Sequence, residues 1–144
     1  MGTEASPLPA PSRSAEVRGT AILAAIGAWT ITVPYLGELL GLTVDVRPIV
    51  EVVDHVIPGA LVVAAALFLR SRARRAPMRS DGTALIAAGI AFLAGFWVLA
   101  THVPLVGDAA AARVTWAAAI WHSIAAVPTL ALACWCVVRS IPEP

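Results

Sequence analysis

Four long apolar segments, separated by short polar stretches, dominate the chain. They lie at about residues 19–40, 49–69, 83–104 and 110–138. Each is close to the roughly 20 residues that a helix needs to cross the hydrocarbon core of a bilayer. Because a membrane-spanning segment must satisfy its own backbone hydrogen bonds, we expect these segments to be helices. The pattern predicts an all-α membrane protein, a bundle of four transmembrane helices within residues 18–140.

The polar stretches predict how the helices are oriented. Residues 1–17 are rich in Pro, Ser and Ala without a hydrophobic period, which predicts a disordered tail. Residues 70–82 are predicted to form a basic loop, whose arginines are Arg70, Arg72, Arg74, Arg75 and Arg79. Of the ten basic residues, only Arg47 and Arg113 fall on the opposite side of the predicted bundle. The positive-inside rule therefore predicts that the loop and both termini are cytoplasmic.

The composition agrees with a membrane protein. The chain is 59% hydrophobic and 13% charged, whereas a soluble domain is about half apolar and about a quarter charged. All the basic residues are arginine, and Lys, Asn and Gln are absent. This bias indicates a GC-rich coding sequence, and we expect an actinobacterial or similar inner membrane protein. The basic loop is expected to fix topology and to contact lipid headgroups rather than nucleic acid.

One residue pattern occurs twice. Gly-x-Trp, Val-Pro-x-x-Gly-acid, Arg and His-x-Ile follow one another from Gly27 to Ile57 and again from Gly95 to Ile124. Two explanations remain open, namely a duplicated helical hairpin and chance similarity between apolar segments. A duplication would relate the halves by an axis along the membrane normal. In that case His55 and His122 would occupy equivalent positions.

Ionisable residues inside a membrane are functional candidates because burying them is costly. Glu51, Asp54 and His55 are spaced i, i+3 and i+4, so they share one helix face. With His102 or His122 opposite, this face could ligate a metal ion or relay protons. Glu51, Asp54, His55 and His102 are therefore the candidate metal ligands. The alternative is a polar helix end near the membrane surface, with arginines as charge partners.

The histidines on two helices also allow a second cofactor hypothesis. His55 and His122 could bind a haem iron from both sides, although the sequence contains no second histidine pair of this kind. His122 is expected to lie about 15 Å along the fourth helix from its start, at 1.5 Å per residue. Ser123 beside it lacks an acidic third partner for a hydrolase triad, so no catalytic residues are predicted.

These observations lead to three functional hypotheses. The first is a non-enzymatic accessory subunit of a larger bacterial inner-membrane complex, most simply a transport complex such as a lipid transporter. It would need no cofactor, and its partners would be other integral membrane subunits and membrane lipid. The second is a small haem- or metal-binding redox protein. The third is a homo-oligomeric proton-coupled transporter.

Overall fold

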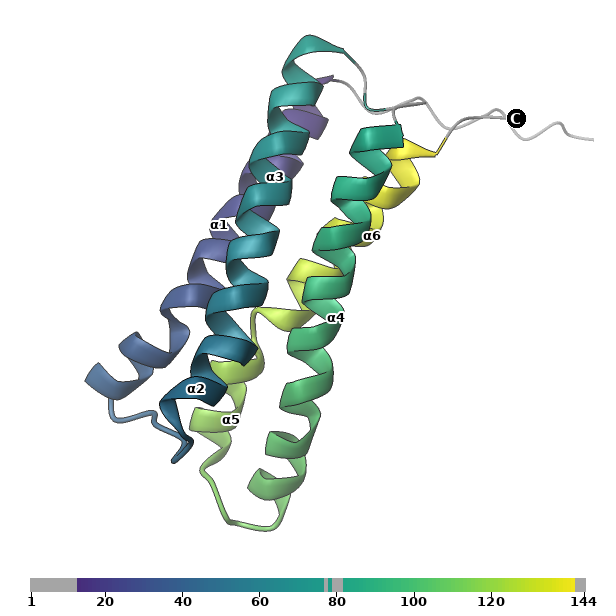
Figure 1. Ribbon diagram of the computed structural model, residues 1–144. Coiled ribbons are helices and arrows are strands. Elements are labelled where there is room, and N and C mark those ends of the chain that lie inside the picture. The colour runs from purple at the N-terminus through teal and green to yellow at the C-terminus, as the bar shows by residue number, and fades with distance from the viewer. Residues whose placement is uncertain (1–12, 77, 79–81, 142–144) are drawn as a thin grey trace, which may run out of the picture.

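The computed structural model describes residues 13–76, 78 and 82–141, and this part of the chain is helical apart from short connections (Figure 1). The helices are α1 (Arg13–Leu39), α2 (Pro48–Glu51), the π-helix η1 (Val52–Val56), α3 (Ile57–Arg75), α4 (Gly82–Ala110), α5 (Trp116–Ser123) and α6 (Ala126–Ser140). Helices α2, η1 and α3 follow one another without a break and form one long segment. Helices α5 and α6 together form another.

Four segments are long and apolar enough to span a bilayer, namely Arg13–Leu39, Pro48–Arg75, Gly82–Ala110 and Trp116–Ser140. Large apolar side chains on each of them point away from the protein. Examples are Ile22 (54% exposed), Leu67 (51%), Leu93 (66%) and Val127 (65%). Soluble proteins rarely expose apolar surface on this scale, whereas a lipid environment favours it. The predicted all-α bundle of four helices is confirmed, and its architecture is that of a multi-pass membrane protein.

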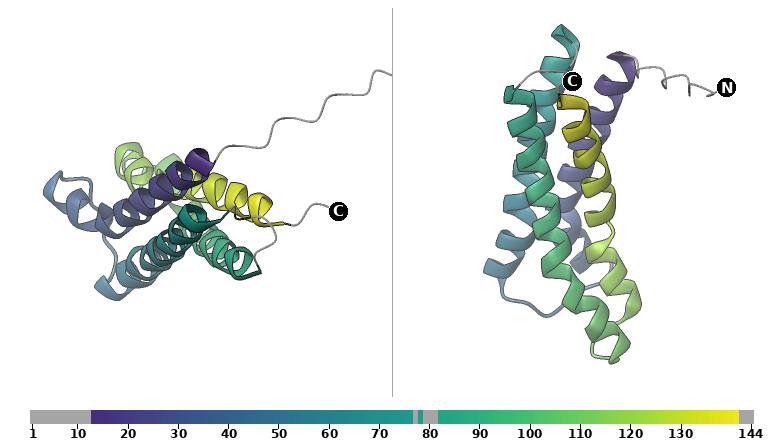
Figure 2. Two further views of the ribbon diagram at one scale, coloured as in Figure 1. Left: turned by 90° about the horizontal axis from the view of Figure 1, so that it is seen from above. Right: turned by 90° about the vertical axis from the view of Figure 1, so that its right-hand side faces the viewer.

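The bundle consists of two helical hairpins that pack side by side (Figures 1 and 2). Helix α1 packs most extensively on α3 and α4 on α6, while α3 and α4 join the two hairpins. The first residue of α1, the last residue of α6 and the end of α3 lie at one end of the bundle. We call this the basic end, and the opposite end, where α2 and α5 lie, the histidine end.

Small residues allow the helices of each hairpin to approach closely. A side chain at Gly27 would contact Val62 and Val63 of α3, and one at Gly95 would contact Thr129 of α6. Gly27 and Gly95 are the glycines of the repeated Gly-x-Trp pattern, so each lies at a close helix contact within its own hairpin. Such small-residue contacts are typical of helix packing in membranes.

The helix boundaries differ from the sequence prediction at the basic end. Helix α1 begins at Arg13, inside the segment predicted as a disordered tail, and residues 1–12 lie outside the described part. Helix α3 continues to Arg75, so the segment from Arg70 to Arg75 is helical rather than loop. Arginine and alanine are good helix formers, which explains the extension. Arg79 lies outside the described residues.

The boundaries also differ at the histidine end. Helix α4 continues past Pro104 to Ala110, and the fourth span begins at Trp116 rather than at about residue 110. The Thr115 side chain accepts a hydrogen bond from the Ala118 backbone N–H at 3.1 Å and caps α5. An N-cap of this kind satisfies one of the unpaired N–H groups at a helix start. The cap therefore sets where the fourth span begins.

Candidate functional site

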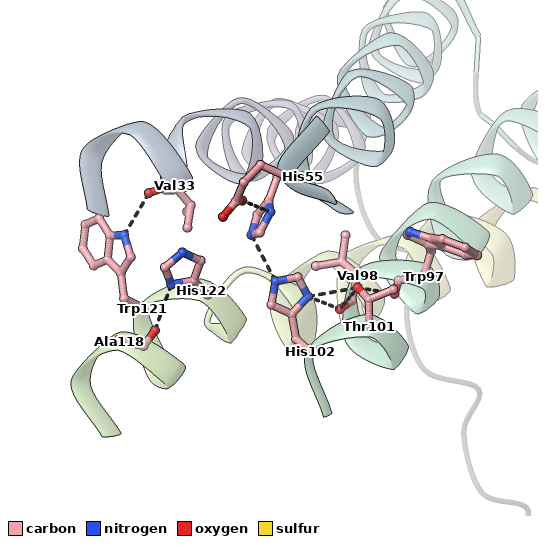
Figure 3. Close-up of polar contacts among 10 residues, drawn as sticks. Val33, His55, Trp97, Val98, Thr101, His102, Ala118, Trp121 and His122 are labelled. Atoms are coloured by element: carbon pink, nitrogen blue, oxygen red, sulfur yellow. Dashed lines mark hydrogen bonds and ion pairs between the residues drawn. The ribbon is translucent and has the colours of Figure 1, made fainter. Parts of the chain in front are cut away.

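The three histidines of the chain lie together inside the histidine end of the bundle (Figure 3). His55 comes from η1, His102 from α4 and His122 from α5, and each is 3% exposed. His55 belongs to the first hairpin, whereas His102 and His122 belong to the second. We call these three residues the histidine cluster. It joins the two hairpins through side chains that are costly to bury without partners.

Prolines shape the helices that carry two of these histidines. Pro58 lacks an N–H, and its ring would clash with the carbonyl of Asp54 in a regular α-helix. The turn before it widens, and the Ile57 N–H donates to the Val52 carbonyl five residues back, as in a π-helix. Similarly, the break between α5 and α6 falls four residues before Pro128. Short π-helical turns are frequent at functional sites.

The cluster lies near the histidine end of the bundle. His122 is six residues from the start of α5, which places it about 9 Å along the helix at 1.5 Å per residue. This is shallower than the 15 Å expected from the sequence, because the fourth span starts at Trp116. His55 is seven residues after Pro48, at about 10 Å on the same basis. Both residues are therefore buried in protein close to the end of the bundle.

The closest contact in the cluster joins two ring nitrogens. The Nε2 atoms of His55 and His102 are 3.0 Å apart, and their ring centroids are 4.7 Å apart. The His122 ring lies 5.6 Å from the His55 ring, edge to face. His55 therefore contacts both of the other rings.

The outward ring nitrogens contact oxygen atoms. His102 Nδ1 lies 2.7 Å from the Val98 carbonyl oxygen, and His122 Nδ1 lies 3.0 Å from that of Ala118. His55 Nδ1 lies 3.0 Å from Glu51 Oε2, one helical turn away. Metal-ligating histidines commonly present their second nitrogen to a backbone carbonyl or a carboxylate in this way.

These contacts limit where the protons of the cluster lie. A backbone carbonyl only accepts hydrogen bonds, so in the neutral imidazole of His102 the proton is on Nδ1 and the lone pair is on Nε2. A neutral His55 that carries its proton on Nε2 can donate it to His102 Nε2 across the 3.0 Å contact. If the proton of His55 is instead on Nδ1, next to Glu51, two lone pairs face one another, and a proton or a metal ion between them would relieve their repulsion.

The spacing is close to that of a metal site. Zinc–nitrogen bonds of about 2.0–2.1 Å in tetrahedral geometry place two ligand nitrogens about 3.3 Å apart. The His55 and His102 nitrogens would need to separate by only a few tenths of an ångström. Among the described residues, however, no group of three His, Cys, Asp or Glu side chains is arranged as an assembled metal site. His122 is the residue that would have to move inward to complete one.

The structure separates the candidate residues predicted from the sequence. It brings together His55, His102 and Glu51, and it adds His122 to the same cluster. Asp54 is half-buried, and no hydrogen bond or ion pair is described for it. The haem hypothesis stays a prediction. The His55 and His122 rings lie with their centroids 5.6 Å apart, and Nε2 of His55 is directed at His102.

Two tryptophans hold the cluster in position. The Trp121 indole N–H donates to the Val33 carbonyl oxygen at 3.0 Å, which ties α5 to α1 next to His122 (Figure 3). Trp29 packs edge to face on Trp121 with ring centroids 5.1 Å apart. Their contacts show that they fix the helix that carries His122.

A second buried polar contact lies at the basic end and was missed in the sequence. Arg139 Nη2 of α6 lies 3.2 Å from Glu16 Oε1 of α1, and the two residues are 9% and 2% exposed. Glu16 was assigned to the disordered tail, so no partner was sought for it. Burial of an ion pair is costly, and the pair is retained only with good geometry. It joins the first and last spans of the bundle.

No protein family, curated protein or solved structure matches this chain, so the function must be argued from the histidine cluster itself.

Proposed function

We propose that the protein binds one divalent transition-metal ion in the histidine cluster, with His55, His102 and His122 as ligands. Imidazole nitrogens suit zinc, copper and nickel ions. A site with three protein ligands leaves a fourth position open to water or to a further ligand, as in many functional zinc sites. The proposal describes a binding protein, and it needs no catalytic residue.

The observation that supports this proposal is the close approach of the Nε2 atoms of His55 and His102, which lie 3.0 Å apart. The Nδ1 atom of His102 hydrogen-bonds to the Val98 carbonyl oxygen, and that of His55 lies 3.0 Å from Glu51 Oε2. Oxygen neighbours of this kind orient metal-ligating histidines. The third imidazole is 3% exposed and contacts the His55 ring. A cluster that merely filled space would not need three imidazoles oriented in this manner.

The location of the site follows from the orientation predicted by the arginines. If the basic end is cytoplasmic, the histidine cluster lies on the outer side of a bacterial inner membrane. The proposed protein would then hold its metal ion within reach of the periplasmic or extracellular solution. This placement would suit a protein that stores, senses or hands on metal ions at the cell surface.

Metal analysis of the purified protein tests this function. The detergent-solubilised chain is stripped with a chelator, incubated with Zn²⁺, freed of unbound ion and analysed by mass spectrometry. We expect one ion per chain in the wild type and a loss of stoichiometric binding in His55→Ala, His102→Ala and His122→Ala. Ser123→Ala, next to His122, serves as the matched control. Equal zinc content in the control and the histidine variants would overturn the proposal, provided that their circular dichroism spectra agree.

The hypothesis of an accessory subunit in a transport complex stays a prediction, since partners leave no trace in a single chain. It is compatible with metal binding, because a subunit can carry a metal site. Purification from native membranes in mild detergent, followed by mass spectrometry, tests it. A stoichiometric membrane partner would support it, and a chain that purifies alone would count against it.

A further inference from the structure

A pocket of about 610 Å³ leads from the surface of the histidine end to the cluster. It lies between the end of α1, the α1–α2 connection and the start of the second span. Its lining includes the carboxylates of Glu38, Asp45 and Glu51, and also His122. We call it the access pocket. The volume is far more than the roughly 10–15 Å³ per water molecule that a cavity must offer, so it can admit a hydrated cation.

The charged lining residues follow a gradient of burial. Glu38 and Asp45 are exposed, Glu51 has a side chain that is 19% exposed, and His122 is 3% exposed. The gradient runs from two carboxylates near the surface to a carboxylate and an imidazole at the cluster. No Lys or Arg is among the lining residues of this pocket. A cation that enters the pocket would therefore meet the carboxylates before it reaches the imidazole of His122.

His122 supplies the second observation, independent of the acidic residues. Its Nδ1 contacts the Ala118 carbonyl, so in the neutral imidazole the lone pair is on Nε2. Among the described residues this nitrogen has no hydrogen-bond partner, and the residue as a whole is only 3% exposed. The side chain lines the access pocket and contacts the His55 imidazole. It is thus the ligand that an arriving ion reaches first.

Two other pockets in the described part of the chain lack this combination. The pocket between the second and third spans, of about 380 Å³, is lined by apolar side chains such as Leu61, Ile90 and Trp97. It faces outward from the bundle and offers no ligand to a cation. A larger pocket near Asp108 and Arg113 carries both signs of charge, and these two residues pair at 2.8 Å.

We infer, on the basis of the proposed metal-binding function, that the access pocket is the route by which a hydrated divalent transition-metal ion reaches the cluster. Glu38 and Asp45 attract the ion electrostatically from the solution at the histidine end. His122 takes it from the pocket, and His55 and His102 complete its coordination. Glu51 lies at the boundary, and its Oε2 atom remains with His55.

Association kinetics test this route. Binding of Cu²⁺ to the metal-free chain in detergent is followed by stopped-flow quenching of tryptophan fluorescence, because Trp121 lies next to His122. Clefts lined by one sign of charge raise association rates by about 10–10³-fold at low ionic strength. We therefore expect the double variant Glu38→Gln with Asp45→Asn to bind about tenfold more slowly. In about 1 M salt, where charges are screened beyond about 3 Å, the difference should nearly vanish.

The matched control is Asp108→Asn, which removes a carboxylate at the same end of the bundle but outside the access pocket. Bound copper is measured in the same samples at equilibrium. One ion per chain together with equal association rates in the double variant and the wild type would overturn the route but leave metal binding intact. An equal slowing in Asp108→Asn would overturn it as well, since the effect would then not depend on the pocket. If neither the wild type nor the variants bind copper, both the route and the proposed function fail.

Discussion

The position of Glu51 predicts that it tunes the metal affinity without being a ligand. Its Oε2 lies 3.0 Å from His55 Nδ1, on the side of the ring away from His102. A carboxylate in this position fixes the ring and makes the opposite nitrogen a stronger ligand. Loss of such a partner typically reduces metal affinity by about 10–100-fold. We expect Glu51→Gln to do so, because glutamine keeps the shape of the side chain and removes its charge.

In free energy, this loss corresponds to about 1.4 kcal/mol for each tenfold change. The measurement is competition for Zn²⁺ against a chromophoric chelator in detergent, which reports both affinity and stoichiometry. The stoichiometry should remain one ion per chain, because all three imidazoles are still present. The control is Asp54→Asn, which alters a half-buried carboxylate on the same helix for which no hydrogen bond is described. We expect a much smaller change there.

Two results would refute this reasoning. If Glu51→Gln binds zinc as tightly as the wild type, the carboxylate does not act on His55. If it loses zinc altogether while its helical content is unchanged, Glu51 is a direct ligand and the assignment of roles is wrong. A loss of similar size in Asp54→Asn would point to the general charge of this helix rather than to the contact with His55.

The remaining predictions concern packing and protons. Gly59→Ala should lower the free energy of unfolding by about 1–3 kcal/mol, because its Cβ would lie 2.8 Å from the Gly27 carbonyl oxygen. Gly89→Ala, whose Cβ meets open space, should leave the free energy of unfolding unchanged. Glu16→Gln should lower the free energy of unfolding by about 3–5 kcal/mol, because it leaves the buried charge of Arg139 without its partner charge. In thermal unfolding, the double variant Glu16→Leu with Arg139→Leu should recover most of that loss. Zinc affinity should fall as the pH is lowered, measured by chelator competition across a pH series, because an imidazole nitrogen must be free of its proton to bind the ion. An affinity that does not change with pH would contradict imidazole ligation.

The sequence predicted the four helices because apolar runs of membrane-spanning length are read directly from composition. It placed helix ends less well, since these depend on local caps such as Thr115 and on the helix propensity of the arginine-rich segment after Leu69. Spacing along a single helix also identified Glu51 and His55 as neighbours on one face. Within one helix, geometry follows from the period alone.

The meeting of His55, His102 and His122 could not be derived in the same way. It depends on how three spans are rotated about their axes, which is set by packing between the hairpins and by the wider turn before Pro58. The sequence grouped two of these residues at a time, as a metal pair or as a haem pair. A signal was nevertheless present, since all three histidines of the chain lie in segments that were predicted to span the membrane.

The two hairpins are joined by polar contacts at both ends and by small apolar residues between them. At the histidine end, His55 of the first hairpin contacts His102 and His122 of the second, and at the basic end Glu16 pairs with Arg139. A metal ion bound by all three imidazoles would therefore hold the hairpins together as well as being held by them. Because an ion that binds only the folded chain stabilises it by about 2.7 kcal/mol at a concentration of 100 times its Kd, metal occupancy and hairpin association are thermodynamically coupled. Any change that moves one hairpin against the other must then alter the metal affinity, which connects this site to whatever the lipid-facing surface of the bundle contacts.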